Sequence, residues 1–299
     1  MEFKEELKKY QQIVNKELEK YIRKENCPEN QLNDAIEYGL MAGGKRLRAI
    51  LVINTFKLFK NDYEKCLPYA IALEMVHNFS LIHDDLPEID DDDFRHGKPT
   101  IHKEYNHATA LLAGDALFNS AYIIISEDIK KACQSGKLEE LNNKAKAFNE
   151  ISLAIDRMIS GEYLDTELEG KEISKDMLEY IHKNKTGALL KVAVRMGAIL
   201  ANASEHDIEK LSNFAEKIGL AFQIKDDILS EEGNQEILGK PVGNDKEHNK
   251  CTYVSFYGLE KAKEELEKII DSAIHDLETY GEKAYFLREL TLFIKNRNK

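Results

Sequence analysis

The sequence predicts an all-α fold, and three observations carry this prediction. Glu, Lys, Leu, Ala and Ile dominate the composition and favour helix, whereas proline occurs only five times and tryptophan is absent. Apolar residues recur at helical spacing along most of the chain. No stretch alternates apolar and polar residues for long enough to predict a strand.

The expected helices follow the periodic stretches in chain order. They cover about 4–22, 32–60, 68–85, 106–126, 139–165, 174–202, 205–231 and 258–296. The helix at 68–85 is apolar on nearly every side until His83, so it should be central and buried. No Pro/Ser-rich linker divides the chain, and we expect one domain over residues 1–299 in which long helices pack around a core.

Charge and cysteine content narrow the functional class. Lys plus Arg number 42 and Asp plus Glu number 54, which gives a formal net charge of −12. Such an acidic balance argues against a general nucleic-acid binder, which needs a basic footprint, but it leaves room for local phosphate sites. The four cysteines form no CxxC pair, so we expect reduced thiols in a reducing compartment.

The N-terminal segment MEFKEELKKYQQIVNKELEKYI is charged and helical in pattern, unlike a signal peptide. No run of 18 apolar residues occurs, so no membrane-spanning helix is expected. These features predict a cytoplasmic protein.

The stretch LIHDDLPEIDDDDFRHGKPT, residues 81–100, places seven acidic side chains within ten residues. Like charges repel most where water is scarce, so a cation should lie among them. Pro87 disfavours a straight helix beyond Asp84 and Asp85, and Asp90 can therefore return near Asp84. Converging carboxylates suit Mg²⁺, which takes oxygen ligands and shares them with substrate phosphates. The competing interpretation is a solvated acidic loop, which would not need the apolar helix before it.

A second stretch, FQIKDDIL at residues 222–229, repeats this arrangement. An apolar helix is again followed by paired aspartates, Asp226 and Asp227. One such pair is common on helices, but two that each close an apolar helix indicate a second group of metal ligands.

Basic residues at several places could hold phosphate groups. In GGKRLR, Gly43 and Gly44 let the backbone approach a ligand, and Lys45 and Arg48 share one helix face. Arg offers a bidentate fork for phosphate and Lys a point charge. Further candidates, each a surface charge if taken alone, are Arg95, Lys185, Lys240 and Lys250. With the two carboxylate groups, these residues predict a diphosphate bound through divalent cations, above apolar helices that form a pocket for a hydrocarbon tail.

A di-iron carboxylate bundle is the alternative with different chemistry. Such sites use two Glu-x-x-His motifs on facing helices, and this chain contains two, at residues 74–77 and 179–182. That interpretation leaves the Asp motifs and the GGKRLR segment unexplained.

In these motifs the chain resembles the trans-isoprenyl diphosphate synthases, the polyprenyl synthetase family. Its short-chain members make geranyl, farnesyl or geranylgeranyl diphosphate. The resemblance runs from about Leu32 to Ala262 and keeps the family's motif order: GGKRLR, LIHDDLPEIDDDD, GKPT, GDALF, KTGALL, FQIKDDIL and LGKPVGND…KCTY…GLEKA. It implies an isoprenoid-synthase-type bundle of long helices around a central cavity, usually a homodimer, with the two Asp motifs facing each other across the cavity mouth.

The resemblance also implies a role for each matching residue. The ligands of Mg²⁺, three ions once diphosphate is bound, would be Asp84, Asp85, Asp90, Asp226 and Asp227. The other contacts to the allylic diphosphate would be Arg95, Lys185 and Lys240, and Lys250 would be a further substrate contact. Isopentenyl diphosphate would bind at Gly44, Lys45, Arg48, His77 and His96. Lys185, Thr186 and Gln223 would lie near the reacting carbons and act in catalysis.

The implied reaction joins isopentenyl diphosphate to dimethylallyl or geranyl diphosphate and yields farnesyl diphosphate. Positive charge neutralises the leaving diphosphate, the allylic C–O bond ionises, and the double bond of isopentenyl diphosphate attacks the cation. Water must be kept out, because it would quench the cation as an alcohol.

Product length depends on the helix that ends at Asp84. Phe79 lies five residues earlier, about 7.5 Å below Asp84 at helical rise, and would close the pocket to larger products. Ser80, one position nearer, is small and leaves room. In the family, an aromatic residue here together with the longer first motif accompanies farnesyl-length products. We therefore predict fifteen carbons, with ten next; the plain alternative is that Phe79 is an ordinary core residue.

Three positions depart from the family pattern. His96 replaces a second Arg, Glu162 replaces the Gln of GQxxD, and Ser230 replaces the last Asp of DDxxD. A class I terpene cyclase, a non-catalytic partner subunit, and a geranyl or geranylgeranyl diphosphate synthase are therefore kept as alternatives. The segment after Gly281, which includes Arg297, is predicted to fold over the diphosphates when substrate binds.

Overall fold

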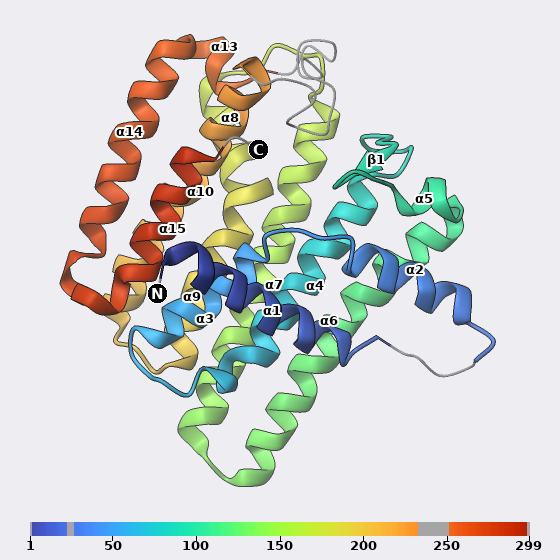
Figure 1. Ribbon diagram of the computed structural model, residues 1–299, viewed down its shortest axis with the longest axis vertical. Helices are drawn as coiled ribbons and strands as arrows, with labels where there is room; N and C mark the ends of the chain where they lie inside the picture. The colour runs from blue at the N-terminus through green and yellow to red at the C-terminus, as the bar shows by residue number, and fades with distance from the viewer. Residues whose placement is uncertain (1, 23–26, 233–250, 298–299) are drawn as a thin grey trace. The chain divides into compact units, whose positions relative to one another are not determined.

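The computed structural model describes residues 2–22, 27–232 and 251–297 (Figure 1). Lys240 and Lys250, two of the predicted phosphate contacts, lie outside these residues. Nearly all of the described chain is helical, which confirms the all-α prediction.

The helices and strands follow one another along the chain with these bounds. The α-helices are α1 (Phe3–Glu19), α2 (Asn30–Leu40), α3 (Leu47–Lys57), α4 (Leu67–Asp84), α5 (Ile101–Glu104), α6 (His107–Ser135), α7 (Leu138–Glu167), α8 (Lys175–His182), α9 (Ala188–Leu200), α10 (Glu205–Glu232), α13 (Tyr253–Tyr257), α14 (Leu259–Asp276) and α15 (Tyr285–Asn296). Helical turns of other types are η1 (Tyr63–Cys66), the π-helical η2 (Lys183–Gly187) and η3 (Glu278–Ala284). Two short strands, β1 (Phe94–Arg95) and β2 (Lys98–Pro99), form an antiparallel hairpin.

Two of the expected helices are each divided in the structure. The stretch 32–60 forms α2 and α3, because the backbone between them passes through left-handed conformations, with φ of 126° at Gly43 and 104° at Gly44. Glycine adopts such angles without steric cost. The last periodic stretch is divided into α14 and α15 at Gly281, where φ is 55°.

The described contacts group the chain into two compact units. Unit 1 comprises Met1–Ile53 and Asp62–Lys146, and unit 2 comprises Asn54–Asn61 and Ala147–Lys299. The prediction of a single domain over the whole chain stays a prediction.

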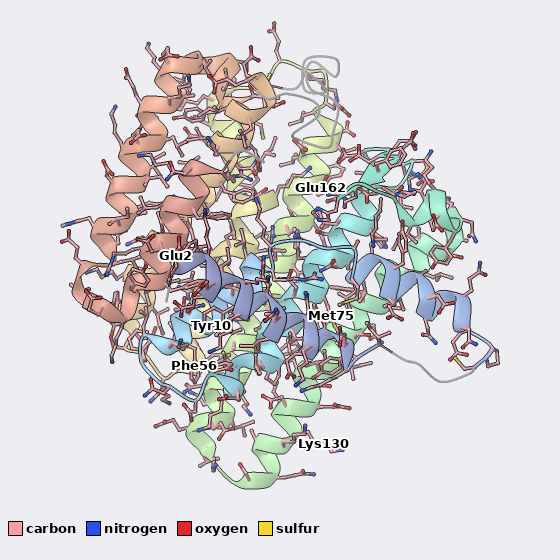
Figure 2. All side chains as sticks on the ribbon, in the orientation of Figure 1. Glu2, Tyr10, Phe56, Met75, Lys130 and Glu162 are labelled. Carbon is pink, nitrogen blue, oxygen red and sulfur yellow. The ribbon has the colours of Figure 1, made fainter. Side chains whose placement is uncertain are left out.

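In unit 1 the central helix is α4, as its apolar sequence predicted. Every residue from Tyr69 to Val76 is buried, and Met75 points into the interior (Figure 2). The helix packs mainly along α6. The two approach closely at Gly114 of α6, where a Cβ would lie 2.2 Å from Nε2 of His83. A larger residue there would displace the ring of His83.

Helix α6 is long and apolar enough, by length and composition alone, to cross a membrane. Its most apolar window has a mean hydropathy of 1.5, and 39% of that window is buried. The sequence analysis expected no such segment. Within unit 1, α6 packs against α4, α2 and α5, as a core helix of a globular protein does, and one such helix is weak evidence for a membrane span.

In unit 2 the central helix is α10, which packs against α14, α9 and α15. Its C-terminal half contributes Ala221, Ile224 and Ile228 to a core that α14 completes with Leu266 and Ile270. This packing holds the segment that carries Asp226 and Asp227.

Candidate active site

The first Asp motif folds back on itself at the end of α4. The backbone N–H of Asp90 donates to the carbonyl oxygen of Asp84 at 2.9 Å, and the N–H of Asp91 donates to that of Leu86 at 3.1 Å. Asp91 reaches this position with a left-handed φ of 48°. The backbone of Asp90 thus returns to Asp84, as the sequence analysis expected.

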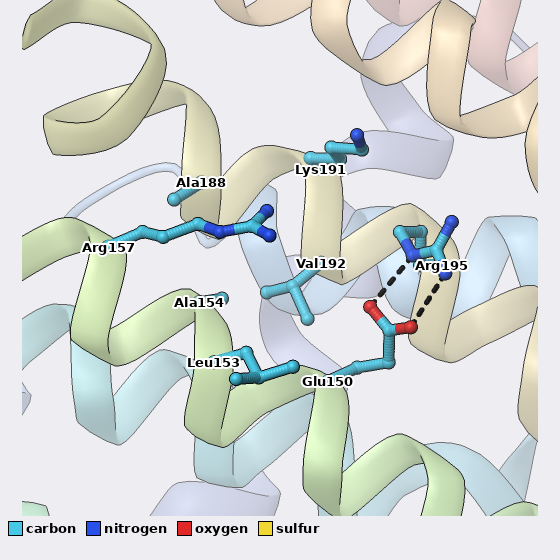
Figure 3. A pocket seen from close by; sticks show the side chains of 8 residues that line it. All are labelled: Glu150, Leu153, Ala154, Arg157, Ala188, Lys191, Val192 and Arg195. Atoms are coloured by element: carbon cyan, nitrogen blue, oxygen red, sulfur yellow. Dashed lines mark hydrogen bonds and ion pairs between the residues drawn. The ribbon is translucent and has the colours of Figure 1, made fainter. Parts of the chain in front are cut away.

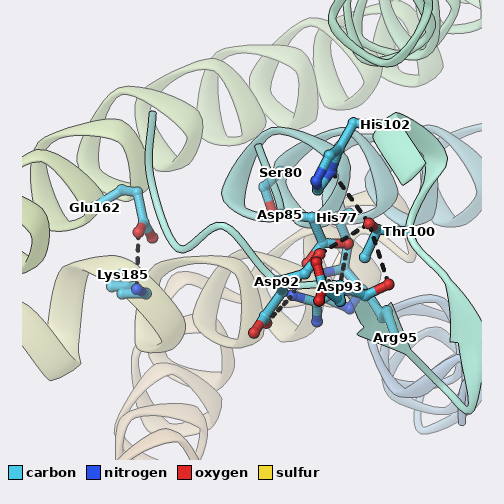
Figure 4. Close-up of polar contacts among 10 residues, drawn as sticks. All are labelled: His77, Ser80, Asp85, Asp92, Asp93, Arg95, Thr100, His102, Glu162 and Lys185. Atoms are coloured by element: carbon cyan, nitrogen blue, oxygen red, sulfur yellow. Dashed lines mark hydrogen bonds and ion pairs between the residues drawn. The ribbon is translucent and has the colours of Figure 1, made fainter. Parts of the chain in front are cut away.

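Arg95 binds one of the predicted metal ligands directly. Its Nε donates to both carboxylate oxygens of Asp85, at 2.7 and 2.8 Å, and its Nη2 lies 2.5 Å from Oδ1 (Figure 4). Burial by itself would lower the pKa of Arg95, but the hydrogen bonds and charge of Asp85 outweigh burial and raise it. Among the described residues, no three His, Cys, Asp or Glu side chains are grouped so that they could hold a metal ion. In the structure, the charge of the buried Asp85 carboxylate is balanced by the guanidinium of Arg95.

The hairpin that follows brings Arg95 to this position. His96 and Gly97 form its two-residue loop, with φ of 52° and 76°. Two successive positive φ angles match the right-handed twist of paired strands. The loop lies close to the GGKRLR segment, since a Cβ at Gly44 would lie 3.8 Å from Nε2 of His96. Two of the predicted substrate contacts are thus brought together within unit 1.

Arg46 and Arg48 have opposite environments. Arg46 is 3% exposed: its Nε donates to Asn15, its Nη2 donates to the carbonyl oxygen of Leu40, and its Nη1 lies 3.7 Å from the carboxylate of Glu74. Arg48 carries a buried Nε that has no hydrogen-bond partner in the described part of the chain. Burial lowers the pKa of Arg48 to about 10, against the raising effect of Glu74 and Asp84, so the guanidinium stays charged at neutral pH. Arg46 is a structural residue, and Arg48 is available for an anion.

His77 lies among these cations. Burial lowers its pKa well below the usual value, and the charges of Arg48, Arg95 and Arg46 lower it further. The imidazole is therefore neutral at pH 7, and it can offer one ring N–H to a ligand but no charge. A neutral His77 leaves Arg48 to supply the charge in this cluster.

The two Glu-x-x-His motifs lie in different surroundings, which do not resemble a di-iron site. Glu74 accepts a hydrogen bond from the backbone N–H of Ala49 and pairs with Arg46. Its carboxylate therefore stabilises the packing of α3 on α4. Glu179 pairs with Lys175 at 3.3 Å, and burial lowers the pKa of His182 to about 4.

Phe79 packs against aromatic residues of α6. Its ring centroid lies 4.8 Å from that of Phe118 and 5.1 Å from that of His83. Phe118 in turn contacts Tyr122 edge to face, at 5.1 Å. The hydroxyl of Ser80 donates to the carbonyl oxygen of His77 at 3.0 Å, which directs it back onto α4. Phe79 thus belongs to an aromatic column between α4 and α6, and the sequence analysis missed the contribution of Phe118.

In unit 2, Lys185 is held by two carboxylates of α7. Its Nζ lies 2.8 Å from Glu162 Oε1 (Figure 4). It also lies 2.6 Å from Asp165 Oδ2. Lys185 and the adjacent Thr186 lie in the π-helical turn η2, a feature often found at functional sites. Burial would lower the pKa of Lys185, but the charges of Glu162 and Asp165 outweigh burial and raise it. Lys185 is therefore a permanent cation at the surface of α7.

The second Asp motif is also engaged. Asp226 pairs with Arg297 at 2.6 Å, and the guanidinium of Arg297 lies 3.8 Å from the ring centroid of Phe222. Asp227 is buried and accepts a hydrogen bond from the backbone N–H of Tyr253 at 2.6 Å. Gln223 lies one helical turn before Asp227 on α10. Arg297 binds the second motif in the structure, and its predicted movement over bound diphosphates stays a prediction.

A cavity of about 230 Å³ opens elsewhere in unit 2, between α7 and α9 (Figure 3). Arg157 points across it, and Arg195 closes one end through a bidentate pair with Glu150. None of the predicted site residues that the structure describes lines this cavity.

The chain is similar to named proteins along most of its length. The sequence pattern of the polyprenyl synthetase family matches residues 29–290. The farnesyl diphosphate synthase of Geobacillus stearothermophilus is 42% identical over 268 residues, which cover 89% of this chain and 88% of that protein. The geranylgeranyl diphosphate synthase of Cyanophora paradoxa is 40% identical over 288 residues, with 96% and 94% covered. The fold matches the crystal structure of an FPP/GFPP synthase from Zymomonas mobilis with a TM-score of 0.85, 32% identity and 98% of each chain covered.

Proposed function

Since the chain belongs to the polyprenyl synthetase family, we propose that it condenses isopentenyl diphosphate with dimethylallyl or geranyl diphosphate to give farnesyl diphosphate. The observation that carries this proposal is the cationic cluster of unit 1. There the buried Nε of Arg48, near His77, has no hydrogen-bond partner among the described residues. A terpene cyclase would need no second diphosphate site, whereas a synthase needs one for isopentenyl diphosphate. The cluster therefore favours the synthase over the cyclase.

The basic side chains are assigned to the diphosphates of the two substrates, and the polar ones to the reacting carbons. Lys185 and Arg95 would hold the diphosphate of the allylic substrate, and Arg48 and Lys45 would hold that of isopentenyl diphosphate. Thr186 and the amide of Gln223 would lie along the reacting carbons. After the allylic C–O bond ionises and the new C–C bond forms, the released diphosphate would accept the proton. The apolar side chains of α4 would keep water away from the cation.

We propose that magnesium binds through the carboxylates of both motifs once a diphosphate brings it to them. The backbone of Asp90 already returns to Asp84, and carboxylate oxygens are the ligands that Mg²⁺ prefers. Asp84, Asp85 and Asp90 would hold it in the first motif, and Asp226 and Asp227 in the second, with three ions in all. When bound, the ions supply positive charge that stabilises the leaving diphosphate. Because Arg95 occupies both oxygens of Asp85, we expect its guanidinium to turn to the diphosphate when Asp85 binds a cation.

Replacement of Arg297 by Ala should lower the Mg²⁺ concentration needed for half-maximal activity by about twofold to fivefold. The substitution removes a competitor for Asp226, since Arg297 lies 2.6 Å from this carboxylate. A titration of activity with Mg²⁺ measures the effect, and a melting curve tests whether the variant is folded. A rise in the Mg²⁺ requirement would contradict this competition and favour the predicted closure of the C-terminal segment over substrate.

Replacement of Phe79 by Ala should lengthen the product to twenty carbons or more. Phe79 packs on Phe118, so removing its ring opens space next to α6. Mass spectrometry of the extracted products measures chain length. Tyr122→Ala, at the far end of the aromatic column, is the matched control and should leave the product unchanged. An unchanged product from Phe79→Ala would place the floor of the pocket elsewhere.

A homodimer is part of the proposal. Helix α6 exposes Leu111, Leu112 and Ile123, and a partner subunit would bury these apolar side chains. Sedimentation at micromolar concentration should give the mass of two chains, and a monomer mass would exclude the dimer. The cytoplasmic location stays a prediction, which cell fractionation would test.

The deciding experiment is a product assay. The purified protein receives Mg²⁺ and isopentenyl diphosphate with either dimethylallyl or geranyl diphosphate, and the products are sized by mass spectrometry. A fifteen-carbon diphosphate is expected, despite the departures at His96, Glu162 and Ser230. A product of ten or twenty carbons would revise the predicted chain length but still support the condensation reaction. A folded protein that binds geranyl diphosphate but makes no condensation product would favour the cyclase or the partner subunit.

A further inference from the structure

The cavity between α7 and α9 in unit 2 has an apolar lining beside its charged side chains (Figure 3). Its volume is about 230 Å³. Ala154, Ala188 and Val192 line it and are buried, whereas Leu153, which also lines it, is 50% exposed. A hydrocarbon group placed in the cavity would cover part of the Leu153 side chain, and burial of apolar surface favours binding.

The acidic side chain of the cavity is already engaged. Both oxygens of Glu150 accept hydrogen bonds from Arg195, at 2.7 and 2.6 Å, and Arg195 also donates to Ser212 at 2.8 Å. Lys191 donates to Glu216 of α10 at 2.5 Å. Of the described residues that line the cavity, only Glu150 is acidic. The lining therefore offers no second carboxylate to a third cation.

Arg157 is this third cation. Its guanidinium points across the cavity (Figure 3), and it makes no hydrogen bond or ion pair with any residue that the structure describes. Its neighbours one helical turn away on α7 are uncharged: Leu153, Ala154, Ser160 and Gly161. An Arg side chain has five N–H donors in a planar fork that matches a phosphate or a carboxylate. Donors without a described acceptor thus lie beside an apolar surface.

We propose that this cavity binds a small organic anion, namely a phosphate or carboxylate carried on a short hydrocarbon group. The anionic group would accept hydrogen bonds from Arg157, and the hydrocarbon would lie on Leu153 and Val192. Because the whole chain has a formal net charge of −12, its surface repels most anions, so saturable binding of one requires a local cationic site. The inference does not depend on the proposed function, since the cavity is lined by other residues.

Replacement of Arg157 by Gln should raise the Kd of butyl phosphate about tenfold, because the charge-assisted hydrogen bonds are lost. Glutamine is a good helix former, so α7 should keep its structure. Arg48→Gln is the matched control: it makes the same exchange at the other arginine with a proposed phosphate ligand. That variant should keep the Kd of butyl phosphate within about twofold of the unaltered protein.

Leu153 tests the apolar part of the proposal. The unaltered protein should bind butyl phosphate about fivefold more tightly than inorganic phosphate, because the butyl group covers apolar surface. Leu153→Ala should remove most of this difference and leave the Kd of inorganic phosphate unchanged. Equal affinity of the unaltered protein for the two phosphates would overturn the proposed apolar contact.

The test is calorimetric titration of the full chain, without Mg²⁺, with butyl phosphate, pentanoate and inorganic phosphate in turn. Melting curves show which variants are folded. Saturable binding of butyl phosphate or pentanoate that Arg157→Gln weakens and Arg48→Gln does not supports the proposal. The proposal is overturned if neither probe binds with a Kd below about 10 mM. It is also overturned if Arg157→Gln has no effect, or if Arg48→Gln weakens binding as much. If Arg157→Gln does not fold, Leu153→Ala decides in the same way.

Sedimentation distinguishes a ligand site from a contact between subunits. Arg157→Gln should sediment with the same mass as the unaltered protein. If this variant instead becomes a monomer while the unaltered protein is a dimer, Arg157 belongs to a subunit interface, and the proposal of an anion site is overturned.

Discussion

Replacement of Asp84 by Ala is expected to lower turnover by on the order of 10³-fold at every Mg²⁺ concentration. Asp84 ends α4, and its carbonyl oxygen accepts the hydrogen bond that returns Asp90 to it. Since that bond involves only backbone atoms, alanine keeps the loop and removes the carboxylate alone. The rate of condensation, measured with isopentenyl and geranyl diphosphates over a Mg²⁺ titration, reports the loss.

Asp93 supplies the matched control in the same acidic segment. Its carboxylate is exposed and pairs with Lys103 at 2.8 Å, and it is not a predicted ligand. Asp93→Ala should keep activity within about twofold. Substantial turnover by Asp84→Ala, or equal loss in both variants, would contradict the assignment of Asp84 as a metal ligand.

Replacement of Arg48 by Gln is expected to raise the KM for isopentenyl diphosphate about 30-fold. Charge-assisted hydrogen bonds contribute about 2 kcal/mol each, which corresponds to this factor. The unfolding free energy should not fall, because the buried Nε of Arg48 makes no hydrogen bond with any residue that the structure describes. Steady-state kinetics with each substrate varied in turn separates the two KM values, and that for geranyl diphosphate should hardly change.

Replacement of Arg46, two residues earlier, should instead lower the free energy of unfolding. Arg46→Gln leaves the carboxylate of Glu74, whose side chain is 3% exposed, without its ion-pair partner. Breaking a buried pair in this manner should reduce the free energy of unfolding by about 3 kcal/mol, as measured in urea. An unchanged KM for isopentenyl diphosphate in Arg48→Gln would remove Arg48 from the substrate site, whatever the stability of the two variants.

Several features of this molecule could be predicted from local sequence. The apolar pattern before Asp84 predicts a buried helix, and α4 is buried along most of its length. Pro87 and the spacing of the aspartates predicted that Asp90 returns to Asp84, and a backbone hydrogen bond now shows it. Such features depend on residues within one or two turns of each other, so periodicity and backbone sterics are sufficient to predict them.

Other features needed the folded chain. The sequence GGKRLR does not predict that Arg46 is buried against Glu74. Nor does it predict that the Nε of Arg48 has no partner among the described residues. The backbone at Arg46 has a left-handed φ of 55°, a conformation that helical periodicity does not predict. The pairing of Asp226 with Arg297 joins positions 71 residues apart. The sequence analysis singled out Asp226 and Arg297 but did not predict that they pair.

The sequence by itself therefore determined the fold class, the family resemblance and the residue types at the site. Tertiary structure alone decided which charges meet: Arg95 on Asp85, Arg297 on Asp226, and both Glu162 and Asp165 on Lys185. The physical reason is that a charge selects its partner by distance and burial, and these are set when helices far apart in the sequence pack together. Helical periodicity specifies the face of each helix on which a side chain lies, but it does not specify the neighbour that this face contacts.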